Sequence, residues 1–420
     1  MTLPGYKGWA PDLYRPMEAS DGLLVRVKPF GARIAADQAR ALAAASQRHG
    51  NGEFQISNRA NIQFRGFTPE GVAAFAEEAC ALGLADTEPE IERRRNILVS
   101  PLGADDSSAA FDSIAVGKSL GVLLRTDRRF AELPPKFRFL VDGGGVLPLS
   151  GTTADVMVRG VDGGAEISIA GGRNAVRCTQ DEIAAVTKAI VLAFLDLGAG
   201  EREPPRRMRM LVATFGEAAV FGTAGVSAEA EAEPLGPPPP PRAGFVPVSN
   251  SRSGAFLIGV PFGQSDGEFL AQCAGLAEQY GNGVLRTTPW RAFAIGGVAA
   301  GRADDLAHAA AAIGAVASAD DHRLAIAACP GTACASGAVD SRADAARFAE
   351  AAAPLPAAVH ISGCAKGCAY AGAANLTLLG TVAGYDVILG GATTDSPAIR
   401  GLSIGDVIDG VESGFLKVPQ

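Results

Sequence analysis

Four cysteines in the last quarter of the chain form two closely spaced pairs, Cys329 with Cys334 and Cys364 with Cys368. The first pair lies in AACPGTACASG and the second in HISGCAKGCAYAG. Closely spaced thiolates can converge on one metal centre. Their small Gly, Ala and Ser neighbours leave room for an inorganic cluster and for backbone N–H groups that point at its sulfurs. We therefore predict that these cysteines hold a [4Fe–4S] cluster, with a zinc site and incidental thiols as the alternatives.

The remaining composition describes the setting of these thiols. Cys80 and Cys273 lie within helical patterns and are expected to be small buried apolar residues, whereas Cys178 stands alone. The chain shows no apolar leader and no long uncharged apolar run, so we expect a soluble, reduced, cytoplasmic protein without membrane contact. Its net charge of −8 disfavours nucleic-acid binding.

The elements that must position the cysteines occur twice. The stretch DGLLVRVKPFG (21–31) reappears as SGAFLIGVPFG (253–263), and each begins with a short apolar strand. An alanine-rich amphipathic helix follows each strand, over residues 34–49 and 267–280. Each helix ends at a GNG sequence, where glycine permits the left-handed turn that stops a helix.

A second strand follows each helix and is predicted over residues 55–67 and 286–298. The resulting β-α-β unit is half of a ferredoxin-like sandwich, and two such halves can complete one sheet. A further repeat comes after it. Residues 153–172 and 374–391 both alternate apolar and polar side chains around a glycine turn, which is typical of hairpins.

The chain is therefore predicted to hold two copies of one arrangement, of which only the C-terminal copy carries the cysteine pairs. Residues 136–145, ahead of the first hairpin, correspond roughly to residues 358–368. The join, EAEAEPLGPPPPPRAGF (229–245), is acidic and then proline-rich, and is predicted to be an extended surface linker. We expect an N-terminal arm with the first half (1–75), a first α/β domain (76–228), the linker (229–245), the second half (246–305) and an iron–sulfur-binding α/β domain (306–420).

Three further segments carry a resemblance to the sirohaem sulfite/nitrite reductase superfamily. SNRANIQFRG (57–66) is similar to the Thr-Thr-Arg-Gln-Asn-x-Gln segment of that family. RNILVSPLGADD (95–106) is similar to its Arg-Asn segment, and LPPKFRFLVDGG (133–144) to its Leu-Pro-x-Lys-Phe-Lys segment. The resemblance covers nearly the whole chain. It implies a duplicated α+β, nitrite/sulfite reductase-like fold, in which two ferredoxin-like half-domains form one sheet beside two α/β domains with mixed sheets.

Within this superfamily the chain most resembles the precorrin-3B synthases, the oxygen-dependent branch that serves cobalamin biosynthesis. The residues concerned are 8–29 (GWAPDLYRPMEASDGLLVRVKP), TPWR (288–291) and SGCAKGC (362–368). Sirohaem reductases usually place five residues between the first two cysteines, whereas Cys329 and Cys334 enclose four. Arg138 stands where they have a second active-site lysine. A sirohaem-dependent assimilatory sulfite or nitrite reductase is therefore the alternative, and a non-catalytic tetrapyrrole or cluster carrier is a third possibility.

The resemblance implies a monooxygenation in which precorrin-3A is hydroxylated at C20 and its ring-A acetate closes a γ-lactone. A substrate with many carboxylates needs cations on several sides. By correspondence with the reductases, and for the last two by internal symmetry, the resemblance suggests a set of substrate-binding residues: Arg59, Asn61, Arg65, Arg95, Asn96, Lys136, Arg138, Arg286 and Arg291. Arg59, Arg95 and Lys136 are the expected catalytic residues. Each cation could instead be an ordinary surface charge or part of a structural ion pair.

The same resemblance implies the cofactors and partners. Electrons would enter through the cluster, with Cys368 on the tetrapyrrole side and Lys366 able to raise the cluster potential. The glycine runs at 142–151 and 170–176 lack a dinucleotide-binding context, so electrons from NADH would arrive through a separate reductase or ferredoxin. The synthase family is also associated with a mononuclear non-haem iron, for which the chain offers few histidine donors: His49, His308, His322 and His360. Sirohaem is expected only under the reductase alternative.

Overall fold

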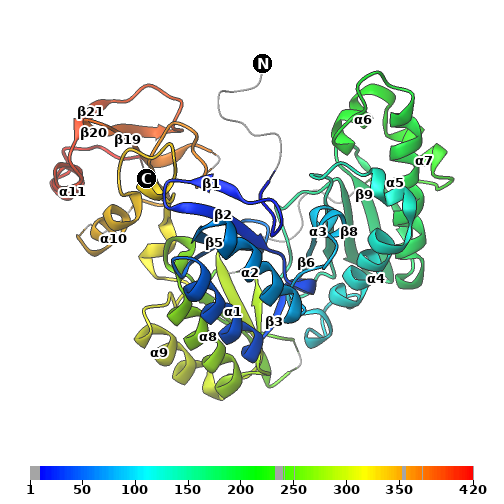
Figure 1. Cartoon of the computed structure of the whole chain (residues 1–420), viewed down its shortest axis with the longest axis horizontal. Coiled ribbons are helices and arrows are strands. Elements are labelled where there is room, and N and C mark those ends of the chain that lie inside the picture. The colour runs from blue at the N-terminus through cyan, green and yellow to red at the C-terminus, as the bar shows by residue number, and fades with distance from the viewer. Residues whose placement is uncertain are drawn as a thin grey trace.

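A computed structural model describes residues 10–231, 240, 242–249, 251–351, 356–370 and 372–419. Two ferredoxin-like halves form the middle of the molecule, and one α/β domain flanks them on each side (Figure 1). Most of the predicted linker (232–239 and 241) and the start of the predicted N-terminal arm (1–9) lie outside the described residues. In the described ranges, no helix combines the length and apolar character that crossing a membrane requires.

Each ferredoxin-like half contains a five-stranded antiparallel sheet covered by two helices. The first sheet has the order β1 (Met17–Ala19), β2 (Gly22–Val27), β5 (Ile62–Phe67), β4 (Glu53–Ile56), β14 (Gln264–Asp266). The second has the order β12 (Gly244–Pro247), β13 (Ser253–Gly259), β16 (Ala292–Ala299), β15 (Val284–Thr287), β3 (Arg33–Ala35). The helices are α1 (Ala36–His49) and α2 (Pro69–Ala81) on the first sheet, and α8 (Gly267–Tyr280) and α9 (Ala303–Ala312) on the second.

The halves do not complete one sheet, as the repeat had suggested, but exchange one short strand each. Strand β3 precedes the helix of the first half and pairs with β15 of the second, with Ile34 opposite Leu285. Strand β14 precedes the helix of the second half and pairs with β4 of the first, with Ser265 opposite Phe54. For this reason helix α1 begins at Ala36, two residues later than predicted, while α8 has the predicted bounds.

The strands predicted over 55–67 and 286–298 are both hairpins, β4–β5 and β15–β16. The chain reverses at Ala60 and Arg291, whose φ angles of 54° and 60° lie in the left-handed region. That conformation is uncommon for residues other than glycine. Neither turn contains a glycine, although Asn58 and Pro289 are residues that turns favour.

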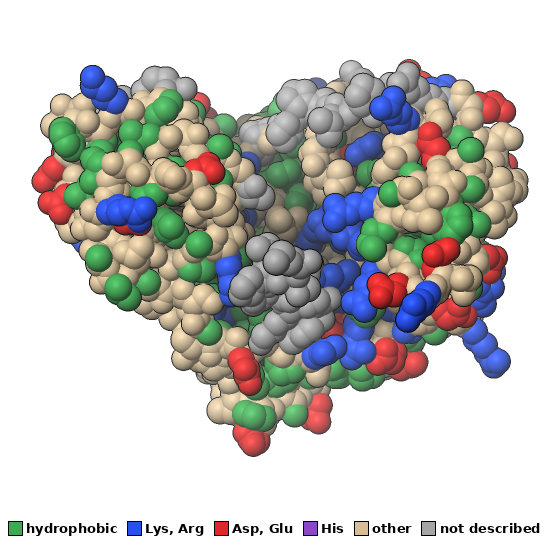
Figure 2. All heavy atoms as spheres, turned by 90° about the horizontal axis from the view of Figure 1, so that it is seen from above, with side chains coloured by type: hydrophobic (Ala, Val, Ile, Leu, Met, Phe, Trp, Pro, Cys, Tyr) green, Lys and Arg blue, Asp and Glu red, His purple; other side chains and the backbone are tan. Residues whose placement is uncertain are grey.

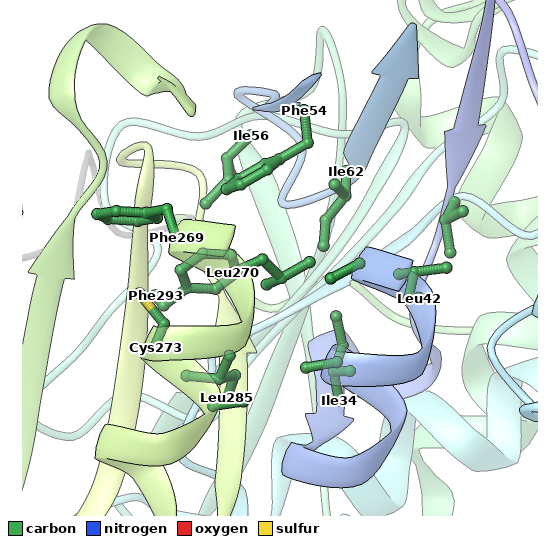
Figure 3. Close-up of a cluster of buried hydrophobic side chains, with 14 of the residues drawn as sticks. Ile34, Leu42, Phe54, Ile56, Ile62, Phe269, Leu270, Cys273, Leu285 and Phe293 are labelled. Atoms are coloured by element: carbon green, nitrogen blue, oxygen red, sulfur yellow. The ribbon is translucent and has the colours of Figure 1, made fainter. Parts of the chain in front are cut away.

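One apolar core joins the two halves (Figure 3). The ring of Phe54 lies 6.5 Å from that of Phe269 and 6.0 Å from that of Phe293, centroid to centroid. Cys273 is fully buried in this core, which confirms its predicted role as a small apolar residue. Burying a Phe or Leu side chain contributes about 1.5–3 kcal/mol. The halves therefore pack as one unit.

The two α/β domains share one plan and have mixed sheets, as predicted. The first has the strand order β11 (Ala230–Glu231), β10 (Asn174–Cys178), β9 (Gly164–Ile169), β8 (Val156–Val161), β7 (Phe139–Asp142), β6 (Ile97–Val99). Its helices are α3 (Pro89–Arg94), α4 (Ser113–Thr126), α5 (Ile183–Ala199), α6 (Met208–Phe215) and α7 (Glu217–Thr223). The C-terminal domain has the order β17 (Ile326–Ala328), β18 (Val359–Ser362), β19 (Ala374–Thr381), β20 (Gly384–Gly391), β21 (Ile399–Leu402), with helices α10 (Ser341–Ala351) and α11 (Ile404–Glu412).

The pairing within these sheets explains where loops gather. Strands β6, β7 and β8 are parallel, as are β17, β18 and β19, and each trio continues into an antiparallel hairpin at the positions predicted from the sequence. Because parallel strands end at the same edge of a sheet, the loops that follow β17 and β18 lie side by side. Those two loops carry the cysteine pairs.

Candidate functional site

A cavity of about 260 Å³ lies between the first ferredoxin-like half and the first α/β domain. Its cationic lining residues are Arg26 on β2, Arg59 in the β4–β5 turn, Arg95 ahead of β6, Lys136 and Arg138 ahead of β7, and Arg207 ahead of α6. No carboxylate occurs among the described residues that line it. In Figure 2 the surface is hollowed into a notch between the two α/β domains. Lys and Arg side chains gather on the side of this notch that the first α/β domain forms. The cavity is therefore suited to a polyanionic ligand.

Asp155 lies behind the cavity and positions two of these arginines. Its carboxylate accepts hydrogen bonds from Arg207 Nε at 2.9 and 3.0 Å, from Met208 N at 2.9 Å and from Arg138 N at 3.0 Å. Burial raises the pKa of Asp155, and the bonds from Arg207 and Met208 partly offset that shift. Arg59 Nη1 donates to Thr153 O at 3.1 Å. Burial lowers the pKa of Arg59, and the nearby Arg207 adds to the shift.

Arg26 and Arg95 are held from other sides. Arg26 Nη2 donates to Gln63 Oε1 at 2.5 Å, and burial lowers the pKa of Arg26 to about 10. Arg95 donates to Glu92 Oε2 at 2.6 Å, and its guanidinium lies 3.8 Å from the centroid of the Phe30 ring. Because Glu92 is fully buried, this ion pair fixes the direction of Arg95.

Lys28 completes the same buried network. Its Nζ donates to the carbonyl oxygen of Glu92. Burial lowers the pKa of Lys28 to about 8, while the Glu92 carboxylate opposes that shift. The cationic wall is thus supported from behind by carboxylates that do not face the cavity.

Six of the nine residues expected to bind substrate line this cavity: Arg59, Asn61, Arg95, Asn96, Lys136 and Arg138. Asn96 also has a structural task, because its Nδ2 donates to Pro135 O at 2.9 Å and so holds the segment that carries Lys136. The structure thus gathers the expected catalytic residues Arg59, Arg95 and Lys136 around one space.

The other three expected residues, Arg65, Arg286 and Arg291, lie elsewhere. Arg286 is fully buried and pairs with Asp105, so it fastens the second half to the first α/β domain. Arg65 forms a bidentate ion pair with Asp21 at 2.8 and 3.0 Å and donates to the carbonyl of Ala333 in a cysteine loop. Arg291 donates to Ala369 O at 2.7 Å in the other cysteine loop. Local sequence does not separate these three arginines from those of the cavity.

Two cationic residues that line the cavity, Arg26 and Arg207, were not predicted from the sequence. Arg26 had a detectable signal, since the repeated segment has the apolar Ile258 at the matching position. A charge where the second copy has an apolar residue indicates a task specific to the first copy. Arg207 belongs to no motif, and only Asp155 brings it to the cavity.

The cysteine loops pack tightly against each other. Cys329 Sγ accepts hydrogen bonds from Gly363 N at 3.0 Å and from Gly331 N at 3.4 Å, as expected for a ligand whose sulfur is surrounded by backbone N–H groups. A Cβ atom on Gly337 would lie 1.9 Å from Gly331 O, so that position admits only glycine. The pKa of Cys368 is raised, first by partial burial and then by the other three cysteines of the two pairs. The four sulfurs therefore share one electrostatic environment.

Two further cations lie beside these loops. Arg342, near the start of α10, lies 3.6 Å from Glu53 and was not expected from the sequence. In the described parts of the chain its Nε and Nη2 have no hydrogen-bond partner, and burial lowers its pKa to about 10. Ser341, its neighbour, places Oγ 3.6 Å from Cys329 Sγ. Lys366 donates to Ser336 Oγ at 3.0 Å and so links the two loops.

A [4Fe–4S] cluster and a single metal ion make different demands on the four cysteines. A zinc ion needs its thiolates within about 2.3 Å of one point. Among the described residues, no three His, Cys, Asp or Glu side chains are placed to hold one ion. Each cysteine of a [4Fe–4S] cluster binds a different iron, so the four sulfurs need not meet. Three of the four histidines form hydrogen bonds to other groups: His49 with Glu78, His308 with Asp304 O and His322 with Ala349 O.

Comparison with known proteins relates this architecture to a family. The family model for the nitrite/sulfite reductase ferredoxin-like half domain matches residues 15–82 and 253–313. The solved structure of Mycobacterium tuberculosis NirA protein superimposes with a TM-score of 0.70 at 21% identity, over 93% of this chain and 79% of that one. The chain has the nitrite/sulfite reductase-like fold. The fold class expected from the sequence is thereby confirmed.

Relatives of this nitrite/sulfite reductase-like chain include a precorrin-3B synthase from Sinorhizobium sp., which is 29% identical over 93% of the chain and 84% of the relative. A ferredoxin–nitrite reductase from Synechococcus elongatus is 26% identical over 67% of the chain and 59% of the relative. The resemblance to the precorrin-3B synthases and the reductase superfamily is thus confirmed. Both named relatives are oxidoreductases.

The Asp155 carboxylate should be the strongest stabilising group of the cavity. Asp155→Ala should lower the free energy of unfolding by about 3–5 kcal/mol, because it leaves Arg207 without its buried partner and two backbone N–H groups unsatisfied. Urea unfolding followed by circular dichroism measures this. The exposed Asp162, in the β8–β9 turn of the same domain, provides the control: Asp162→Ala should change stability by less than about 0.5 kcal/mol. Equal stability of the two variants would contradict the assignment.

Proposed function

We propose that this protein is a precorrin-3B synthase, an O₂-dependent monooxygenase of aerobic cobalamin biosynthesis. It would hydroxylate precorrin-3A at C20 and close a γ-lactone from the ring-A acetate. The observation that carries this proposal is the cavity lined by six cations and, among the described residues, no carboxylate. It occurs in a chain that is 29% identical to a precorrin-3B synthase over 93% of its length.

The cationic wall would bind the carboxylate arms of the macrocycle. Arginine forks suit carboxylates because they donate two parallel hydrogen bonds. A cavity of about 260 Å³ is smaller than a tetrapyrrole, so it would take the carboxylate-bearing edge while the ring lies in the notch of Figure 2. Arg59, Arg95 and Lys136 are the proposed catalytic residues. Their charges would stabilise negative charge that develops on oxygen as it is reduced.

Cys329, Cys334, Cys364 and Cys368 would hold a [4Fe–4S] cluster, which supplies electrons one at a time when bound. One oxygen atom would become the C20 hydroxyl, and the other would leave as water after taking up two electrons and two protons. The electrons would come ultimately from NADH through a reductase or ferredoxin. A mononuclear iron finds no donor set in the described ranges, so no role is proposed for one.

Anaerobic absorption and EPR spectra, recorded before and after dithionite, test the cofactor assignment first. The expected result is a broad shoulder that bleaches on reduction, without haem bands. Cys364→Ser and Cys368→Ser should each abolish that shoulder, because each removes one ligand. Cys178→Ser is the matched control, since Cys178 lies on β10 of the other α/β domain.

Other spectra would support a different function. Intense sirohaem bands would favour a sulfite or nitrite reductase, the function that the likeness to the Synechococcus ferredoxin–nitrite reductase supports second. A cluster spectrum with tetrapyrrole binding but without O₂ consumption would favour a carrier. Full cluster content in Cys364→Ser would refute the cluster assignment.

Arg207 offers a test of the cavity itself. Arg207→Gln should weaken binding of a polycarboxylated porphyrin at least tenfold, because a charged hydrogen bond contributes about 1.5–3 kcal/mol. Fluorescence quenching of the porphyrin measures the dissociation constant. Arg206→Gln is the control, since Arg206 is exposed and does not line the cavity. Arg59→Gln should repeat the loss without removing a hydrogen bond from Asp155. Unchanged affinity in both variants would show that the porphyrin does not bind in this cavity.

Arg342 should tune the cluster. Arg342→Gln should lower the reduction potential, because it removes a positive charge that favours the more negative, reduced cluster. A redox titration monitored by EPR measures this. Arg347 on the same helix is mostly exposed and lies 3.5 Å from Asp344, so Arg347→Gln should leave the potential unchanged. Equal potentials in both variants and the wild-type protein would show that Arg342 has no electrostatic effect on the cluster.

A further inference from the structure

The duplicated fold repeats, in the C-terminal domain, the strand pair that lies behind the cavity. In the first copy, Leu98 and Leu140 line the cavity as the middle row of the parallel β6–β7 pair. Strands β17 and β18 pair in the same register, which makes Ala327 and His360 the matching residues. His360 therefore occupies the position that Leu140 has on the wall of the cavity.

His360 is a buried imidazole without a hydrogen-bond partner. Its residue is fully buried, and within the described ranges neither Nδ1 nor Nε2 is paired. Burial, with a smaller contribution from Arg291, lowers the pKa of His360 to about 4, so the ring is neutral at pH 7. A neutral imidazole has one N–H to donate and one nitrogen that accepts. Because unpaired buried polar groups are costly, the position calls for a bound ligand or water.

Two arginines lie at this position. Arg291 Nη2 donates to Ala369 O at 2.7 Å, and Arg242 donates to the carbonyl of Leu324. Leu324 precedes β17 by two residues, as Arg95 precedes β6 in the first copy. In the described parts of the chain, neither Arg242 nor Arg291 forms an ion pair with a carboxylate. Burial lowers the pKa of Arg291, and the neighbouring Arg242 adds to the shift.

The three groups differ in their exposure to solvent. Arg242 is exposed, Arg291 is half-buried and His360 is fully buried. The Tyr370 ring, whose centroid lies 5.9 Å from that of His360, covers one side. Two positive charges that are close together and lack a carboxylate repel each other, and an anion between them would remove that repulsion.

We infer that Arg242, Arg291 and His360 bind a small oxyanion at this matching position of the C-terminal domain. The guanidinium forks would bind its oxygens, and the His360 N–H would donate to it from below. The oxyanion is either a free inorganic ion or a carboxylate of the macrocycle. Binding of a free ion here does not depend on the reaction proposed above, whereas a macrocycle carboxylate as the occupant rests on that proposed function. None of the three residues lines the first cavity.

Equilibrium dialysis of the full-length protein with radiolabelled sulfate at low ionic strength tests this inference. Two classes of site are expected, one in each copy. Arg291→Gln and Arg242→Gln should each weaken one class at least tenfold and leave the other unchanged, whereas Arg59→Gln should do the reverse. Arg252→Gln should affect neither class, because Arg252 is exposed in the same half of the molecule.

His360→Leu guards against a failure to fold, since it installs the side chain that Leu140 has in the first copy. It should fold and lose the class of sites that depends on Arg291. Wild-type sulfate binding in Arg291→Gln, Arg242→Gln and His360→Leu would overturn the inference, as would a single class abolished by Arg59→Gln.

A polycarboxylated porphyrin then distinguishes the two sources of the oxyanion. Displacement of sulfate from the Arg291-dependent class would identify the occupant as a carboxylate of the macrocycle. Porphyrin binding without displacement would identify it as a free ion.

Discussion

The exchange of one short strand between the two ferredoxin-like halves is the constraint on which the rest of the molecule depends. Each half is completed only by the other, through β3 on β15 and β14 on β4. Helices α1 and α8 start directly after the exchanged strands, so the exchange also sets how they pack. The turns that follow then meet, with Thr287 Oγ1 donating to Ala60 O at 2.6 Å. Both α/β domains are built onto this shared centre (Figure 1).

The arginines of this protein fall into two groups, which differ in how their carboxylate partners are placed. Arg65 pairs with Asp21 and donates to the carbonyl of Ala333, which links the first half to the C-terminal domain. Arg286 pairs with Asp105 and links the second half to the first α/β domain. Arg207 also has a carboxylate partner, but Asp155 binds it from behind and leaves its other side to the cavity. Because the rotamers of these arginines are already restricted, the entropic cost of ordering them when a ligand binds is smaller. A cationic wall with its carboxylates on the far side is thus ready to receive an anion.

The two copies of the α/β plan show how one backbone arrangement serves two tasks. In the C-terminal copy Gly363 N donates to Cys329 Sγ at 3.0 Å, and in the first copy Gly143 N donates to Ser100 Oγ at 3.1 Å. Ser100 follows β6 as Cys329 follows β17. The backbone hydrogen bond is retained while the acceptor changes from a thiol to a hydroxyl. The fold allows the same loop geometry in both copies, and the side chains distinguish them, with a thiol in one and a hydroxyl in the other.

The sequence by itself determined the local elements and the duplicated plan. Periodicity and close spacing are local properties. The sequence therefore predicted the helix at 267–280, the hairpins at 153–172 and 374–391, and the two pairs of closely spaced cysteines. The tertiary structure alone decided the strand exchange, the turns at Ala60 and Arg291, and which arginines face a cavity. Those outcomes depend on partners such as Asp155 and Asp105, which lie 52 and 181 residues away along the chain from the arginines they bind. Long-range pairing and burial decide the direction of a charged side chain, and neither leaves a periodic trace in the sequence.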